Sequence, residues 1–309
     1  MCVAMTSEAT RTWRPDWPCP VVAILAQQRR GSGDPTLRLD VGGRQWRASR
    51  TPEGPATLAL DVRRRDGEVV AEAWGPGAAW ALAQLPDLLG AADDWSGFEP
   101  QHPVVAEAWR RHPHLRLGRT GLVTESLVPA VIEQRVTGKQ AFAGFRTLVR
   151  RYGEPAPGPG ADVGLWLQPE PGAIRAVPSW EWLRLGIDES RSRTVVTAAR
   201  HATALERVTA DPASADRRLR SLPGVGAWTS AEVRQRALGD PDAVSFGDFH
   251  VAKDVGWALT GTPVDDAEMA VLLEPWRPQR GRVPLLLGAA GLRRPRRGPR
   301  LAVPGHLPP

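Results

Sequence analysis

The chain of 309 residues contains few cysteines, few lysines and no long apolar run, and each scarcity excludes a class of protein. Two cysteines, Cys2 and Cys19, are too few for a disulfide scaffold or an iron–sulfur centre, which takes about four cysteine ligands. No segment approaches the roughly 20 apolar residues of a membrane span, and the run 21–26 does not resemble a signal peptide. We therefore expect a reduced, cytoplasmic protein with no metal held by its side chains.

Lysine is nearly absent although basic residues outnumber acidic ones by 40 to 34, which gives a net charge of +6. Lys139 and Lys253 are the only lysines, so arginine supplies almost all of the positive charge. A basic chain favours a polyanionic partner such as nucleic acid, but this excess is small and arginine bias also follows from GC-rich codon usage. The 13 tryptophans and the 42% of hydrophobic residues exclude a wholly disordered chain.

The first hundred residues have the period-two alternation of half-buried strands. Strands are expected over 37–41, 45–49, 57–62 and 69–74. Asp66-Gly67 between the last two predicts a hairpin turn, and a helix should follow over about 77–89. These elements predict an α+β N-terminal domain over 1–100, an antiparallel sheet with helices, joined to the rest by a linker at 93–103.

The pattern beyond residue 100 is helical, and we expect an all-α domain over 101–292. Helices are expected over 127–152, 180–185, 191–208, 217–221, 227–238 and 248–258. The final segment, 293–309, combines arginines with prolines and is expected to be a disordered basic tail.

A glycine-containing turn, Leu222-Pro223-Gly224-Val225-Gly226, separates two of the expected helices. Glycine can take positive φ there and lets another backbone approach closely. The first N–H groups of the following helix have no partner within it, and together with the helix dipole they form an anion site that suits a DNA phosphate. On the pattern alone, an ordinary pair of antiparallel helices is the alternative.

Asp248 follows Gly247 about twenty residues later and opens the expected helix 248–258. An isolated Asp there would be an N-cap, worth about 1 kcal/mol. A hairpin followed at this distance by such an Asp resembles the helix-hairpin-helix DNA glycosylase superfamily, and within it the bacterial 3-methyladenine DNA glycosylase II type. Ile132-Glu133-Gln134 and the Trp276-x-Pro278-x-Arg280 stretch are also similar to that family. The resemblance covers roughly residues 30–290 and implies a helical domain of two lobes.

The resemblance implies that Asp248 is the catalytic carboxylate. A glycosylase flips its base out of the duplex and cleaves the N-glycosidic bond through an oxocarbenium-like transition state. A carboxylate stabilises that cation and can orient or deprotonate the attacking water. An alkylated purine already carries positive charge and leaves without a strong general acid, so alkylated purines are the expected substrates.

Pocket residues follow from the same resemblance. Trp228 stands where strand-nicking relatives carry a Schiff-base lysine, which predicts a monofunctional enzyme that leaves an abasic site. Its indole is expected to be a wall of the base pocket, with a core tryptophan as the alternative. Phe249 matches an aromatic pocket position. Glu232 and Gly288 stand where aromatics are common, so Glu232 either contacts the base or faces solvent, and the lesion remains open.

The resemblance further implies a DNA-binding set. It consists of Leu222, Gly224, Val225, Gly226, Thr229, Gln134 and Arg135. Arg135 takes the position of the wedge that fills the gap left by the flipped base, with a surface arginine as the alternative, and Gln134 contacts either DNA or local backbone.

The expected partner is double-stranded damaged DNA, bound by a monomer associated with the nucleoid. No prosthetic group is expected, although a monovalent cation at the hairpin backbone remains open. The alternatives are a glycosylase for deaminated or other damaged bases, and a non-catalytic protein that binds damaged DNA.

Overall fold

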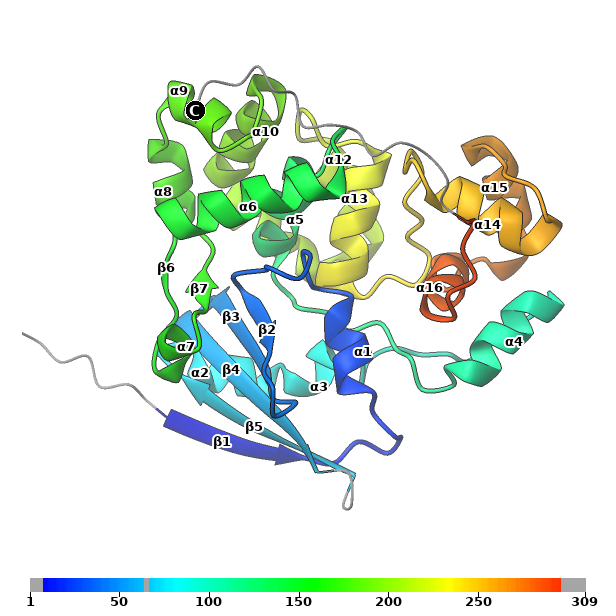
Figure 1. Cartoon of the computed structure of the whole chain (residues 1–309), viewed down its shortest axis with the longest axis horizontal. Coiled ribbons are helices and arrows are strands. Elements are labelled where there is room, and N and C mark those ends of the chain that lie inside the picture. The colour runs from blue at the N-terminus through cyan, green and yellow to red at the C-terminus, as the bar shows by residue number, and fades with distance from the viewer. Residues whose placement is uncertain (1–7, 64–66, 296–309) are drawn as a thin grey trace, which may run out of the picture.

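The computed structural model describes residues 8–63 and 67–295 (Figure 1). The turn expected at Asp66 and most of the basic tail expected over 293–309 lie outside these ranges. Within them, no helix combines the length and apolar character needed to cross a membrane.

A five-stranded antiparallel sheet forms the N-terminal part, in the order β1-β5-β4-β3-β2. Its strands are β1 (Glu8–Trp13), β2 (Leu37–Leu39), β3 (Gln45–Thr51), β4 (Gly54–Arg63) and β5 (Glu68–Trp74). The alternation in β4 places Leu58 and Leu60 against α1 (Val21–Ala26) and α2 (Ala78–Ala83). Ala59 faces the other side, where it packs with Trp46 and Trp74. The expected α+β architecture is therefore confirmed.

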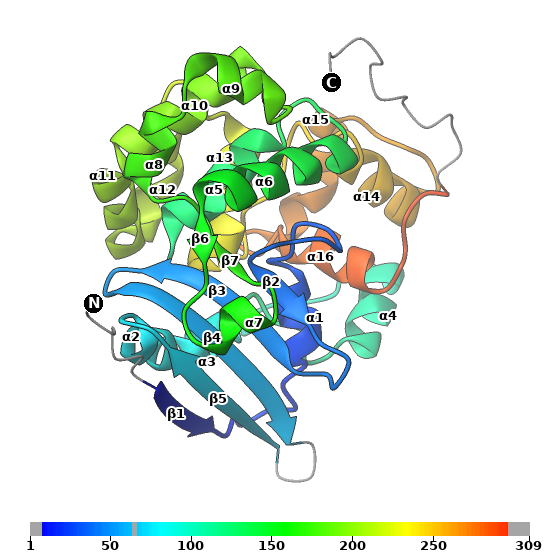
Figure 2. The ribbon, with the colours of Figure 1, turned by 60° about the vertical axis from the view of Figure 1, so that its left-hand side comes forward.

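The second face of the sheet is also covered. A short hairpin, β6 (Glu154–Pro155) and β7 (Trp166–Leu167), and α7 (Pro159–Asp162) lie against it, as Figure 2 shows. Of these elements, β6 and α7 lie in the proline- and glycine-rich segment 153–162.

Two of the expected helical segments are divided at residues with a local reason. The helix predicted over 77–89 is α2 followed by α3 (Leu85–Leu88), where Pro86 lies in the first turn. The helical segment expected over 127–152, which resembles a helix pair, consists of α5 (Val123–Ile132) and α6 (Gly138–Tyr152). Thr137 begins α6 by a capping box with Gln140, so the chain turns between the two helices.

The helices pack around two hydrophobic cores. The larger core surrounds α5, whose last seven residues are all buried. Its other helices are α6, α8 (Pro171–Ala176), α9 (Ser179–Arg184), α10 (Glu189–Arg200), α11 (Ala202–Glu206), α12 (Ala215–Arg220) and α13 (Ala227–Val233). The smaller core joins α4 (Pro103–Arg111), α14 (Val251–Thr260), α15 (Asp266–Leu273) and α16 (Arg282–Ala289).

The segment expected as a linker, 93–103, is part of this smaller core. Asp93 is buried against Arg282 of α16, and Phe98 packs edge-on against Trp95 and Trp109. The chain therefore passes directly from the sheet into the C-terminal helices, with α4 beside α16 (Figure 1).

Candidate active site and DNA-binding surface

The turn between α12 and α13 requires glycine at position 224. Gly224 has φ of +86°, and a Cβ added there would lie 2.0 Å from the Thr194 hydroxyl oxygen on α10. Gly226 precedes α13, and no side chain caps that end of the helix. Both glycines are exposed, so the backbone of this turn and the first N–H groups of α13 face solvent.

Three other residues expected at the hairpin point inward. Leu222 and Val225 are 8% and 6% exposed and belong to the larger core, and Thr229 is 2% exposed. The side chains of these three residues anchor the turn. Any contact with DNA from these positions is left to the backbone.

Gln134 links the end of α5 to this turn. Its Nε2 donates to the Gly224 carbonyl oxygen at 2.9 Å and to the Thr229 hydroxyl oxygen at 2.7 Å. Of its two expected roles, contact with local backbone is the one that the geometry realises. The next residue, Arg135, is exposed and has φ of +56°, the one non-glycine left-handed φ among residues 8–63 and 67–295. Because Gln134 is hydrogen-bonded to the turn, the Arg135 side chain next to it is exposed to solvent beside the hairpin.

Asp248 is half-buried and lies three residues before Val251, the first residue of α14. One carboxylate oxygen, Oδ1, accepts hydrogen bonds from the backbone N–H groups of His250 at 2.7 Å and Val251 at 3.0 Å. The other, Oδ2, accepts from the Trp228 indole Nε1 at 3.3 Å. The first oxygen therefore fixes the carboxylate, and the second retains capacity for a further partner.

Asp248 lines a cavity of about 240 Å³ between α14 and α16. Asp254, His250, Pro284, Leu287, Gly288 and Arg293 are among its lining residues. Arg293 lies beside Gly288, because a Cβ added at Gly288 would be 3.0 Å from a guanidinium nitrogen. The glycine thus makes room for an arginine from five residues further along the chain.

A second cavity of about 300 Å³ adjoins the first, since both are lined by Val251, Pro284 and Arg293. Its wall includes Glu232 of α13, which is 9% exposed. Contrary to the solvent-facing alternative, this carboxylate is buried.

Two side chains hold the Glu232 carboxylate. Its oxygens accept from the Ser245 hydroxyl at 2.6 Å and from Arg236 at 2.5 Å. Burial favours the neutral acid, but Arg236, the nearby Arg30 and the Ser245 bond together hold the pKa of Glu232 below its usual value. The group is therefore an anion near neutral pH.

Two expected pocket rings do not line either cavity. Phe249 is 71% exposed, with its ring edge-on to His250 and the Lys253 ammonium 3.6 Å from its centroid. This corrects the expectation of a pocket phenyl ring, because the side chain after the capping Asp248 points outward. Trp228 is absent from both linings and instead meets Asp248 through its indole nitrogen.

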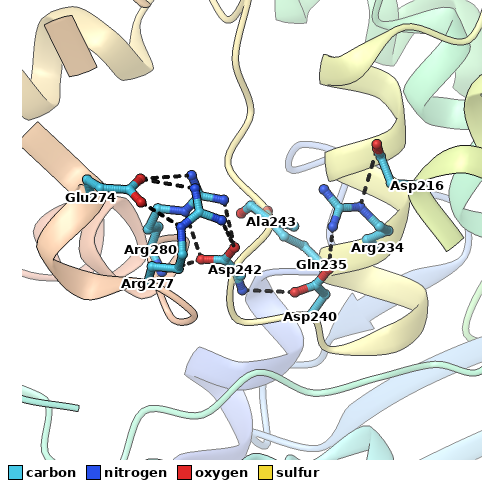
Figure 3. A network of polar contacts seen from close by, with 9 residues as sticks. All are labelled: Asp216, Arg234, Gln235, Asp240, Asp242, Ala243, Glu274, Arg277 and Arg280. Carbon is cyan, nitrogen blue, oxygen red and sulfur yellow. Dashed lines mark hydrogen bonds and ion pairs between the residues drawn. The ribbon is translucent and has the colours of Figure 1, made fainter. Parts of the chain in front are cut away.

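Ion pairs brace the segment between α13 and Asp248, as Figure 3 shows. Arg280, from the Trp-x-Pro-x-Arg stretch, donates to both Asp242 oxygens, at 2.8 and 2.6 Å. Gln235 donates to the Ala243 carbonyl oxygen at 2.6 Å, and Arg234 pairs with Asp240 at 2.5 Å. Sequence reasoning singled out Arg280 without its partner, because Asp242 is 38 residues away in the chain.

Throughout the described ranges, no group of three or more His, Cys, Asp or Glu side chains is placed to hold an ion. At the hairpin, the carbonyl oxygens of Leu222 and Gly224 already accept hydrogen bonds from Val225 and Gln134.

The solved structures that superpose on this chain include DNA glycosylases. A 3-methyladenine DNA glycosylase from Archaeoglobus fulgidus superposes with a TM-score of 0.75 at 16% identity, over 91% of this chain and 98% of that one. The Clostridium acetobutylicum 8-oxoguanine glycosylase/lyase in complex with double-stranded DNA gives 0.70 at 11%, over 93% and 97%. At such identities the likeness concerns the fold, and at that level it confirms the resemblance to helix-hairpin-helix DNA glycosylases.

A curated protein is also similar to this chain in sequence. A probable bifunctional transcriptional activator/DNA repair enzyme AlkA from Mycobacterium tuberculosis is 31% identical over 182 residues, 54% of this chain and 33% of that protein. The chain thus matches about a third of the relative's length. No protein-family model matches the chain.

Proposed function

We propose that the protein is a DNA glycosylase of base-excision repair, with Asp248 as its catalytic carboxylate. The observation that carries the proposal is this one carboxylate, fixed by two backbone N–H groups and an indole at the opening of a cavity. The DNA repair enzyme and the two glycosylases to which the chain is similar support the same reading.

The proposed reaction is hydrolysis at C1′ of a flipped nucleotide. As the N-glycosidic bond breaks, its electron pair leaves with the base, and the sugar acquires oxocarbenium character. The free lone pairs of Asp248 Oδ2 stabilise that charge and accept a hydrogen bond from the attacking water. The water oxygen bonds to C1′, its proton passes through Asp248 Oδ2 to solvent, and an abasic site remains. A cationic base leaves as a neutral molecule, whereas a neutral base leaves as an anion that takes up a proton from solvent. Water is the co-substrate, and no prosthetic group is required.

We propose that the enzyme does not cut the strand. Trp228 occupies the position where strand-nicking relatives would place a lysine. Of the two lysines, Lys139 is exposed on α6, and Lys253 stacks on the outward-facing Phe249. Because the clostridial neighbour is a glycosylase/lyase, this part of the proposal needs its own measurement.

The proposed DNA interface is the exposed backbone at Gly224 and Gly226 together with Arg135. Backbone N–H groups would bind a phosphate, and the Arg135 guanidinium would stack into the gap left by the flipped base. Such a protein would act as a monomer on double-stranded DNA at the nucleoid. Its affinity should fall steeply with salt, as a few phosphate contacts require.

Alkylated purines are the first candidate substrates, because the resemblance is to 3-methyladenine glycosylases. One observation favours the second candidate, a neutral deaminated or oxidised base. Among the described residues, no indole, phenol or phenyl ring lines either cavity, so the cation–π contacts that suit a charged base are missing from both walls.

The test is base release from duplexes that each carry one defined lesion. The protein is incubated with each duplex, and half of each sample is then heated in alkali to cleave abasic sites. We expect strand breaks only in the alkali-treated half. Breaks without alkali, or a covalent adduct trapped by borohydride, would contradict the monofunctional reading. Binding without release from every duplex would favour a protein that only recognises damage.

A further inference from the structure

The two cavities beside Asp248 are lined by charged and amide groups. Glu232 and Arg236 come from α13 and its extension, Arg293 follows α16, and Gln27 and Gln28 follow α1. Asp240 also lines the larger cavity, but it is already paired with Arg234. Asp254 of α14 is a further carboxylate in the wall of the smaller cavity, beside Asp248. The walls thus combine carboxylate acceptors with several strong donors.

Glu232 is a buried acceptor with lone pairs to spare. Each of its oxygens accepts one hydrogen bond, from Ser245 or from Arg236, and a carboxylate has about four acceptor sites. The carboxylate is an anion at neutral pH, so it can accept an N–H from a base but cannot donate to a ring nitrogen.

Arg293 is the donor that reaches both cavities. Its guanidinium lies 3.0 Å from where a side chain at Gly288 would begin, in the space that an aromatic ring at position 288 would fill. A guanidinium donates to carbonyl oxygens, and it repels a positively charged ring that an indole would attract.

We infer that these cavities select an uncharged purine with a lactam edge, an N–H next to a carbonyl oxygen, with Glu232 and Arg293 as specificity-determining residues. Glu232 accepts the N–H, and Arg293 donates to the carbonyl oxygen. Hypoxanthine and 8-oxoguanine share this edge, one arising by deamination and the other by oxidation. The inference rests on the proposed function and names its substrate class.

Undamaged guanine carries a lactam edge as well. Its exclusion follows from the cost of flipping, which is lowest for mismatched or damaged bases.

Glu232 also has a structural contact, which the test must separate from recognition. Through Ser245 it ties α13 to the segment that carries Asp248, since the Asp248 N–H donates to the Ser245 carbonyl oxygen at 3.2 Å. Loss of the hydrogen bonds through Ser245 would displace Asp248 and slow the release of every base equally. Loss of a specific contact would change the ratio between bases.

The experiment varies two properties of the base independently, its charge and the presence of the lactam edge. Hypoxanthine and 8-oxoguanine are neutral with the edge, and 7-methylguanine is cationic with it. Ethenoadenine is neutral without the edge, and 3-methyladenine is cationic without it. Single-turnover release is measured for each base and divided by its spontaneous rate, because cationic bases leave more readily by themselves.

Two variants and two matched controls are compared with the wild type. Glu232→Gln and Arg293→Met each remove one charge at nearly constant size. Glu189→Gln and Arg110→Met make the same changes on the exposed faces of α10 and α4, where the side chains are 82% and 73% exposed.

For the wild type we expect the largest rate enhancement on hypoxanthine or 8-oxoguanine and the smallest on 3-methyladenine. Glu232→Gln should lower the enhancement for the lactam bases about 10-fold or more and leave ethenoadenine within about 3-fold. Arg293→Met should raise 7-methylguanine relative to hypoxanthine by about 10-fold. Both controls should match the wild type.

Three results would overturn the inference. A largest enhancement on 3-methyladenine, or variants that change all five bases by one common factor, would show that these residues do not select the base, while the proposed function stands. If no base is released, the proposed function is contradicted, and the inference that rests on it is contradicted as well.

Discussion

Two arginine–carboxylate pairs, Arg282 with Asp93 and Arg236 with Glu232, differ in whether a ligand can reach them. Arg282 and Asp93 have side chains 0% and 2% exposed, joined by two hydrogen bonds of 2.8 and 2.6 Å. Arg282 also donates to the Asp94 carbonyl oxygen and to Gln279, and its guanidinium stacks on Trp95 at 4.2 Å. Each nitrogen of the Arg282 guanidinium donates a hydrogen bond, so the role of this pair is to hold the segment at Asp93, between α3 and α4, against α16.

The pair of Arg236 with Glu232 is similar in chemistry but open on one side. The side chains are 19% and 11% exposed, and both residues line the larger cavity. Within residues 8–63 and 67–295, the Arg236 Nε has no hydrogen-bond partner although it is buried. A closed pair stabilises the fold, whereas an open pair retains hydrogen-bonding capacity for a ligand. The following predictions test this difference.

Asp93→Asn should have the largest effect on stability. It leaves the Arg282 guanidinium buried without its counter-charge, which costs about 3–5 kcal/mol of unfolding free energy. Urea unfolding measures the loss, and Glu107→Gln, which breaks exposed pairs on α4, should leave the unfolding free energy close to that of the wild type. A loss for Asp93→Asn as small as that of its control would show that the closed pair is not structural.

Glu232→Gln should destabilise the protein less, by about 1–2 kcal/mol. The amide keeps a hydrogen bond to Ser245, and Arg236 is sufficiently exposed to be hydrated. The same urea measurement applies. A loss equal to that of Asp93→Asn would mean that both pairs are structural and would remove the contrast between them.

The acid dependence of the open pair should be smaller still. The folded-state pKa of Glu232 is lowered, so its charge stabilises the fold above the unfolded pKa of about 4.3, and this contribution is lost as the pH falls through the folded value. The stability difference between wild type and Glu232→Gln should stay constant from about pH 8 to 5 and shrink below about pH 4.3. A difference that grows on acidification would mean that the folded-state pKa is raised.

Local patterns predicted the parts of the molecule that depend on local physics. Alternation in 57–62 and 69–74 predicted two paired strands, because one face of each must be buried. The glycines at 224 and 226 predicted the turn, since φ of +86° at Gly224 excludes most other residues. Asp248 was expected at a helix start, and it caps α14 through two backbone N–H groups.

Features that depend on distant partners were not predicted. Asp93 was assigned to a linker because its partner Arg282 is 189 residues away. Strand β1 was missed, since it pairs only with β5 at the edge of the sheet. Gly288 suggested a missing pocket wall, and no local pattern indicates that Arg293 lies beside it. The resemblance placed an aromatic ring at Phe249, but the capping geometry of Asp248 directs that ring outward.

The central claim is that Asp248 performs hydrolysis, and Asp254 provides the matched control. Asp254 is a second carboxylate that lines the same cavity, on α14, where it accepts the backbone N–H of Arg294 at 3.3 Å. Single-turnover release of hypoxanthine should fall by about 1,000-fold or more in Asp248→Asn, on the scale of losing a principal transition-state contact, and stay within about 5-fold of wild type in Asp254→Asn. Equal rates in wild type and Asp248→Asn, with both variants folded, would contradict the account.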